Sequence, residues 1–335
     1  MIKRLGRYTL EFEDGIGITG YGAVAGKKES EGKLGENFDK IIYDSYAGQK
    51  TYEQAENIFQ QEAFERALSR AEKKAEDVDM IFAGDLLNQC IGSSYGLKSF
   101  GVPYLGIYGA CSTMAEGLIM SSVYLASGAG RCCACVTSSH FCTAERQYRF
   151  PLDYGGQRTP TSQWTVTGSG GCVLEKSKNG IKISRALIGR IVDYDIKDLN
   201  NMGAAMAPAA AVTITDFLRD TKTVPKDYDL ILTGDLGEVG SKCLYSLLED
   251  DGIDLKGIHN DCGLMIFSRE RQDVHSGGSG AGCCASVLCS TILPDIEKGK
   301  YKNILFVATG ALMSPVSSQQ GGAIPAIAHL VNIRK

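Results

Sequence analysis

Tyr108-Gly-Ala-Cys-Ser-Thr-Met-Ala-Glu116 joins an expected strand to an expected helix. The apolar run Val102–Tyr108 leads in as the strand, Gly-Ala makes the turn, and Ser112 and Thr113 are typical of a helix start. Cys111 would then lie at a helix N-terminus, where free backbone N–H groups and the helix dipole favour an anion. The same position suits a thiolate, a bound carboxylate, or simply a small buried cysteine in a tight turn.

The chain also contains an internal repeat. One pair of matching segments is separated by 150 positions and two further pairs by 171: Ile81–Leu87 with Ile231–Gly237, Gly109–Thr113 with Gly280–Cys284, and Arg131–Ser139 with Lys302–Gly310. The difference between these offsets indicates an insertion in the second half. We therefore predict two similar halves, residues 1–178 and 179–335, with a site where they meet.

Hydrophobic periodicity predicts an α/β protein. Short apolar runs read as buried strands at Met80–Ala83, Arg131–Thr137, Leu230–Thr233, Ile304–Thr309 and Leu264–Phe267. Thr51–Asp77 carries small and apolar residues at four-residue spacing among charged ones, as expected of an amphipathic helix. Strands that alternate with helices favour a mostly parallel sheet.

Composition excludes several classes of function. The 335 residues carry a formal net charge of −4, with 44% hydrophobic and 22% charged residues. No basic cluster favours nucleic acid or anionic lipid, so we expect no nucleic-acid partner. No apolar run reaches the roughly 20 residues of a membrane helix, and the first residues lack the apolar core of a signal peptide. Any membrane association is expected to be peripheral.

The 12 cysteines are expected to be free thiols in a reducing compartment. Cys132 and Cys135 have a spacing that can bind zinc, but residues three apart in a strand point to opposite faces. We therefore predict no metal site in the protein.

Several polar residues are candidates for ligand binding. His259, followed by Asn260, lies in a turn-rich segment, and His140 ends an expected strand. A long polar loop, 138–170, contains Arg146 and Arg149 beside aromatic residues, and arginine binds carboxylates in a bidentate way. Asp85 and Asn88 follow a buried strand and could contact a ligand or a cation, although Asp235 occupies the equivalent repeat position.

These features together resemble the thiolase and ketosynthase superfamily and, more closely, the stage V sporulation protein AD family of spore-forming bacteria. The resemblance rests on segments spread over almost the whole chain: 25–35, 82–89, 109–113, 143–151, 165–170, 205–210, 259–265 and 307–311. It implies a thiolase-like fold of two duplicated halves in αβαβα layers.

The resemblance also implies a function. The family binds dipicolinic acid (pyridine-2,6-dicarboxylate) and acts with the membrane proteins of its operon to load dipicolinate and calcium into the forespore, at the inner membrane. No cofactor is implied, apart from calcium that accompanies the ligand. The superfamily usually forms dimers, so a homodimer is expected.

The chain departs from the catalytic pattern of the superfamily. Cys111 and His259 fit two catalytic roles, but 278–286 offers no Asn or His for the third, only Cys283 or Cys284. We therefore predict a binding protein rather than an enzyme. Two alternatives stay open: an acyl-CoA-dependent condensing enzyme with Cys111 as nucleophile, and a purely structural docking subunit. The residues predicted to bind the ligand are Asp85, Asn88, Cys111, His140, Arg146, Arg149, His259 and Asn260.

Overall fold

The computed structural model describes residues 1–149, 158–177 and 179–335. Its strands are β1 Ile2–Leu5, β2 Thr9–Gly26, β3 Lys40–Ile42, β4 Met80–Gly84, β5 Tyr104–Gly106, β6 Cys132–Ser139, β7 Trp164–Thr165, β8 Gly168–Glu175, β9 Lys182–Leu187, β10 Leu230–Thr233, β11 His259–Asp261, β12 Gly278–Ser279, β13 Asn303–Ala311 and β14 Ala326–Arg334.

The α-helices are α1 Lys27–Ser30, α2 Tyr52–Arg70, α3 Ile91–Leu97, α4 Thr113–Ser127, α5 Phe141–Arg149, α6 Met202–Thr221, α7 Gly237–Asp250, α8 Cys262–Ile266, α9 Ala281–Val287, α10 Leu293–Glu297 and α11 Pro315–Gln319. A π-helical turn, Leu288–Ile292, joins α9 to α10 in one continuous helix.

The sheet shows the predicted duplication. Its strands run in the order β11-β10-β13-β14-β9-β2-β8-β6-β4-β5. Counted inward from the two ends of the sheet, the strands correspond in pairs. The second strand from each end gives the pair β10 and β4, and the third gives the pair β13 and β6, as the sequence repeat predicted. Along the chain, the predicted boundary at residue 178 falls between β8 and β9, and residue 178 itself lies outside the described residues.

The sheet was predicted to be mostly parallel, and this prediction was wrong for the central strands. Strands pair in parallel at the two ends, where β5, β4 and β6 lie together and β13, β10 and β11 lie together. All pairs between β6 and β13 through the centre are antiparallel. Helical crossovers connect the parallel strands at the two ends of the sheet, as parallel neighbours require.

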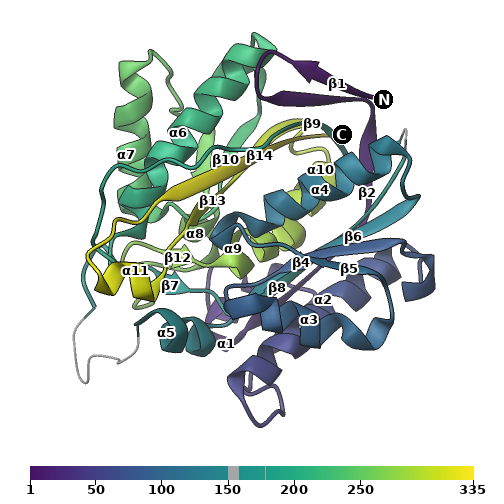
Figure 1. Ribbon diagram of the computed structural model, residues 1–335, viewed down its shortest axis with the longest axis horizontal. Helices are drawn as coiled ribbons and strands as arrows, with labels where there is room; N and C mark the ends of the chain where they lie inside the picture. The colour runs from purple at the N-terminus through teal and green to yellow at the C-terminus, as the bar shows by residue number, and fades with distance from the viewer. Residues whose placement is uncertain (150–157, 178) are drawn as a thin grey trace.

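The layers have helices between and outside the two halves of the sheet. Figure 1 shows α4, α9 and α10 in the middle, α2 and α3 on one outer side, and α6 and α7 on the other. Every residue of α9 is buried, as expected for a helix covered on all sides. The central position of α4 and α9 places the N-termini of both helices inside the molecule.

Two local predictions need correction. Leu264–Phe267 was expected to be a strand, but α8 covers most of it, because the Asp261 side chain accepts a hydrogen bond from Leu264 N (3.2 Å) and caps a helix. The predicted loop 138–170 contains α5, the whole of β7 and parts of β6 and β8. The predicted helix 51–77 ends at Arg70, and Glu72 adopts a left-handed conformation (φ 54°).

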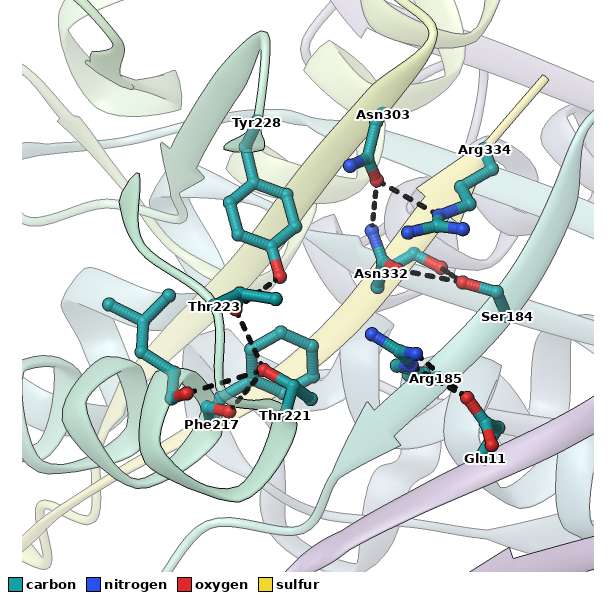
Figure 2. Close-up of polar contacts among 11 residues, drawn as sticks. Glu11, Ser184, Arg185, Phe217, Thr221, Thr223, Tyr228, Asn303, Asn332 and Arg334 are labelled. Carbon is teal, nitrogen blue, oxygen red and sulfur yellow. Dashed lines mark hydrogen bonds and ion pairs between the residues drawn. The ribbon is translucent and has the colours of Figure 1, made fainter. Parts of the chain in front are cut away.

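A buried polar side chain fixes the register of the last strand. Asn332 is fully buried where the pairing of β14 with β9 shifts register. Its Nδ2 donates to Asn303 Oδ1 (2.7 Å) and to the Ile304 carbonyl (2.9 Å), and its Oδ1 accepts from Ser184 Oγ (2.7 Å). Figure 2 shows Asn332 between Asn303 and Ser184. Because both amide hydrogens and the amide oxygen have partners, this burial is tolerated and holds β14 between β13 and β9.

Candidate functional site

A pocket opens at Cys111, where the two halves of the molecule meet. The space between its walls is about 440 Å³ when the open solvent at its mouth is counted, and the part that the centre of a water molecule can reach is about 40 Å³. We call it the Cys111 pocket, and it is lined by Leu86, Tyr108, Ala110, Cys111, Ala144, Glu145, Tyr148, Thr165, Met202, Ser279, Gly280, Ala311 and Met313. Both repeats contribute to this lining, as the sequence analysis predicted for a duplicated fold.

The turn before α4 holds Cys111 in the pocket. Ala110 adopts a left-handed conformation (φ 51°), which is unusual for a residue other than glycine. Thr113 stabilises the turn, since its hydroxyl donates to the Ala110 carbonyl (2.7 Å) and accepts from Gly109 N (3.1 Å). The result is that Cys111, although only 6% exposed, faces the pocket at the start of the helix.

The matching turn of the second half forms the other side of the pocket floor. Gly280 has φ 106°, which favours glycine, and it precedes the first residue of α9. Buried Asp235 fixes this turn, because its carboxylate accepts hydrogen bonds from Ser279 Oγ (2.7 Å), Gly280 N (2.9 Å) and Thr309 Oγ1 (2.8 Å). The N-termini of α4 and α9 therefore both lie at the pocket, and their dipoles favour a negatively charged group there.

The immediate neighbours of the Cys111 thiol do not activate it. Its sulfur lies 4.0 Å from Ser279 Oγ. Burial and the nearby Asp235 carboxylate raise the pKa of Cys111 well above its usual value. Burial likewise raises the pKa of Asp235. The thiol is therefore protonated near neutral pH, and the thiolate that the helix N-terminus could have favoured does not form.

Two tyrosines lie at the mouth of the pocket. The Tyr108 and Tyr148 hydroxyls are 2.8 Å apart, and Tyr148 also donates to the Leu86 carbonyl. Burial raises the pKa of both phenols, so each keeps its proton. Their rings come from different elements, since Tyr108 precedes Cys111 and Tyr148 lies on α5.

His259 does not line the Cys111 pocket, so it does not form with Cys111 the catalytic pair that the condensing-enzyme alternative requires. It lies on β11, the edge strand of the second half, and is not part of the pocket lining. Its Nδ1 bonds to Tyr245 OH (2.8 Å) and its Nε2 to Thr233 Oγ1 (3.0 Å). Burial lowers the pKa of His259 to about 4, so the ring is neutral. The sequence predicts a loop position for His259, but the residue lies on β11, outside the pocket lining.

His140 and Asp85 also lie outside the pocket lining, in buried hydrogen-bond networks. His140 Nδ1 accepts from Cys142 N (3.2 Å), so its Nε2 donates to the Ser45 carbonyl (2.9 Å), and burial lowers its pKa. Asp85 accepts from Leu87 N (2.8 Å) and from the N–H and hydroxyl of Ser93 (2.7 and 2.6 Å). These bonds shape the turn that presents Leu86 to the pocket, and so Asp85 acts on the site through the backbone.

Asn88, Arg146 and Asn260 are not part of the pocket lining. Arg146, on α5, forms an ion pair with Glu53, and its side chain is 55% exposed. Arg149 ends α5, but its side chain lies outside the described part of the chain. Asn88 is exposed, and its backbone N–H donates to Gln147 Oε1 (3.0 Å). Asn260 lies in a separate surface groove with Lys33 and other residues.

Sequence reasoning missed several residues of the site: Tyr108, Tyr148, Ser279, Met202 and Met313. The repeat that aligns the Gly109 and Gly280 turns was a usable signal for Ser279, since it brings both turns to one place. Tyr148 lies in the predicted loop 138–170, but only the helical form of α5 directs it to the pocket.

The described residues contain no group of three or more His, Cys, Asp or Glu side chains arranged to hold a metal ion. All 12 cysteines are free, and the pair at 132 and 135 is buried in β6. Over the same described ranges, no helix combines the length and the apolar character needed to cross a membrane.

Comparison with known proteins identifies relatives over almost the whole length. The family model described as stage V sporulation protein AD (SpoVAD) matches residues 6–334. The stage V sporulation protein AD of Bacillus subtilis (strain 168) is 42% identical over 328 residues, which cover 98% of this chain and 97% of that protein.

Solved structures show where the fold belongs. The 3-oxoacyl-[acyl-carrier-protein] synthase III from Aquifex aeolicus VF5 superimposes with a TM-score of 0.60 over 96% of this chain and 100% of that one, at 14% identity. OleA from Xanthomonas campestris, in a co-crystal with cerulenin, gives a TM-score of 0.62 over 96% of this chain and 97% of that one, at 13% identity. At these identities the likeness shows the fold alone, which is thiolase-like as predicted.

Proposed function

The chain belongs to the stage V sporulation protein AD family, and we propose that it binds dipicolinic acid in the Cys111 pocket for uptake into the developing spore, without catalysing a reaction. The observation that carries the proposal is a site with two helix N-termini around a thiol that stays protonated and has no histidine in the pocket lining beside it. Such a site attracts an anion but does not attack it.

The chemistry of the pocket suits a flat aromatic dicarboxylate. One carboxylate would lie at the floor, at the N-termini of α4 and α9. Tyr108 and Tyr148 offer ring surfaces for the pyridine, and Met202 and Met313 line the pocket with thioethers that adapt to an aromatic ligand. The second carboxylate would then lie toward the mouth.

The absence of catalysis is inferred from Cys111 and His259 together. A cysteine nucleophile needs a lowered pKa or an adjacent base. Burial raises the pKa of Cys111, and both ring nitrogens of His259 have partners elsewhere. The condensing-enzyme alternative would require these two residues to move together.

Calcium is proposed to enter with the ligand. Glu145 lines the pocket, and Asp235 lies beneath its floor. Carboxylate oxygens are ligands that calcium prefers, and a calcium ion would reduce the repulsion between these acids and a dicarboxylate. The proposal therefore includes stronger binding of dipicolinate in the presence of calcium.

We also propose that the protein works at the inner membrane of the forespore, as a peripheral partner of the membrane proteins of its operon. The proposed oligomer is a homodimer through β5. This strand ends the sheet, and its Leu105 is 49% exposed. An exposed apolar edge strand is a surface on which a second copy can pair.

The test is a calorimetric titration of the protein with dipicolinate, with and without calcium, in parallel with intact-mass analysis after incubation with acetyl-CoA. Saturable binding with no acyl adduct supports the proposal. An acyl adduct on Cys111 without dipicolinate binding would instead favour the condensing-enzyme function.

A further inference from the structure

Helix α5 is fastened to the pocket mouth by a small set of hydrogen bonds. Near its C-terminal end, Gln147 Nε2 donates to the Leu86 carbonyl (2.7 Å), and Gln147 Oε1 accepts from Asn88 N (3.0 Å). Tyr148 donates to the same Leu86 carbonyl. We call these three hydrogen bonds the latch. They join α5 to the turn after β4, and this turn is otherwise held by Asp85.

Both phenol hydrogens at the mouth are already donated in hydrogen bonds. Tyr148 has one hydroxyl hydrogen and gives it to the Leu86 carbonyl, which can only accept. The 2.8 Å contact between the two phenols must therefore use the hydrogen of Tyr108. A carboxylate entering the pocket finds a phenol donor only if one of these bonds breaks.

The two phenols also stand in the way of a ligand. Both line the pocket, and their hydroxyl contact joins Tyr108, which lies near Cys111, to Tyr148 on α5. Tyr108 is 43% exposed, so the contact lies at the opening and not at the floor. Because Tyr148 is carried by α5, a movement of this helix away from Leu86 separates the two phenols.

We propose that the Tyr108–Tyr148 pair is the gate of the Cys111 pocket, and that a carboxylate ligand keeps it open by taking the Tyr148 hydrogen bond from the Leu86 carbonyl. Ligand binding then releases the C-terminal half of α5 from the turn after β4. Tyr148 thereby becomes a ligand-binding residue, and Gln147, which is not part of the lining, becomes a residue that sets how often the gate opens. The ligand part of this inference rests on the proposed function.

The inference predicts opposite effects on affinity for two neighbouring residues. Gln147→Ala removes two latch bonds without touching the pocket, so more molecules are open and the apparent affinity for dipicolinate rises. Tyr148→Phe also opens the gate, but it removes the hydroxyl that would bind the carboxylate, so the affinity falls. The loss of one or two hydrogen bonds corresponds to changes of roughly three- to thirtyfold.

The gate is tested without any ligand by the rate at which iodoacetamide alkylates Cys111, followed by peptide-resolved mass spectrometry at alkaline pH. Gln147→Ala and Tyr148→Phe are expected to raise this rate roughly three- to thirtyfold over the wild type. Gln61→Ala is the matched control, because Gln61 Nε2 donates to the Gly96 carbonyl (2.8 Å) and so also joins a helix to a neighbouring backbone, outside the pocket lining. The control is expected to leave the Cys111 rate unchanged.

Titration of the same variants with dipicolinate completes the test. Tighter binding by Gln147→Ala together with weaker binding by Tyr148→Phe supports the gate. Unchanged alkylation rates in both variants, or equal weakening of binding in both, would overturn it. If the wild type binds no dipicolinate, the proposed function fails, and the alkylation rates still decide whether the phenol pair is a gate.

Discussion

The Cys111 thiol and the Ser279 hydroxyl lie 4.0 Å apart at the floor of the pocket, and the Ser279 hydroxyl donates its hydrogen to Asp235. This relationship separates the site from that of an enzyme with a cysteine nucleophile. The nearby Asp235 carboxylate raises the pKa of the thiol, whereas a protonated histidine would lower it.

The first prediction follows for acyl transfer. Incubation with acetyl-CoA or malonyl-CoA near pH 7 is expected to give no covalent adduct, because the protonated thiol is a weak nucleophile. Intact-mass spectrometry and the release of free coenzyme A measure this. A burst of coenzyme A that disappears in Cys111→Ala would show instead that the pocket is catalytic.

A second prediction concerns pH. Glu56 is fully buried and accepts from Ser138 Oγ (2.9 Å) and Thr143 Oγ1 (2.8 Å), and burial raises its pKa to about 8. As the pH rises, the unfolded state therefore releases the Glu56 proton near pH 4.5, whereas the folded state keeps this proton until about pH 8. The stability that this proton provides is complete below about pH 4.5 and is lost as the pH rises toward and through about 8.

Glu56→Gln is expected to remove this loss of stability at higher pH, since the neutral amide matches the protonated acid in shape. Between pH 6 and pH 8 the free energy of unfolding of the wild type should fall by about 1–3 kcal/mol more than that of the variant. Urea unfolding at both pH values measures the difference. Identical pH slopes for the two proteins would mean that Glu56 is ionised in the folded state.

The buried amide in Figure 2 gives a third prediction. Asn332→Ala leaves the Ile304 carbonyl and the Ser184 hydroxyl without their partner inside the sheet, and is expected to lower the free energy of unfolding by about 2–4 kcal/mol. Ser184→Ala removes only one of the three bonds and should cost less. Equal costs for the two variants in urea unfolding would contradict a role for Asn332 in holding the register.

Assembly through the edge strand is the basis of the fourth prediction. Leu105→Lys places a charge on β5, half exposed at the end of the sheet, and is expected to convert a dimer to a monomer in analytical ultracentrifugation. Val316→Lys is a suitable control, because Val316 is also exposed (63%) but lies on α11. A wild type that sediments as a monomer would refute the proposed dimer.

The sequence predicted those strands of the fold that are short apolar runs between turns, whereas the central strands β2, β8, β9 and β14 were not predicted. β10 matches its predicted range, and the repeat placed the turns at Gly109 and Gly280 together. The prediction failed where a run is ambiguous. Four apolar residues at 264–267 suit a strand or a helix, and only the bond between Asp261 and Leu264 N selects the helix.

The candidate site was predicted only in part, for a similar reason. Cys111 could be recognised because the strand, turn and helix around it are local in sequence. The position of His259 depends on pairing between β10 and β11, and that of Tyr148 on the docking of α5 against the turn at Leu86. Both are long-range arrangements, and neither residue has a local pattern that fixes its distance from the thiol.

The central claim is that dipicolinate binds in the Cys111 pocket, and the most direct test is isothermal titration of wild type, Cys111→Ala, Ser279→Ala and His259→Ala with dipicolinate in the presence of calcium. We predict saturable binding by the wild type, weakened roughly three- to thirtyfold by the two changes in the pocket floor and unaffected by His259→Ala. Absence of binding by the wild type, or binding that depends on His259 and not on the pocket residues, would contradict the account.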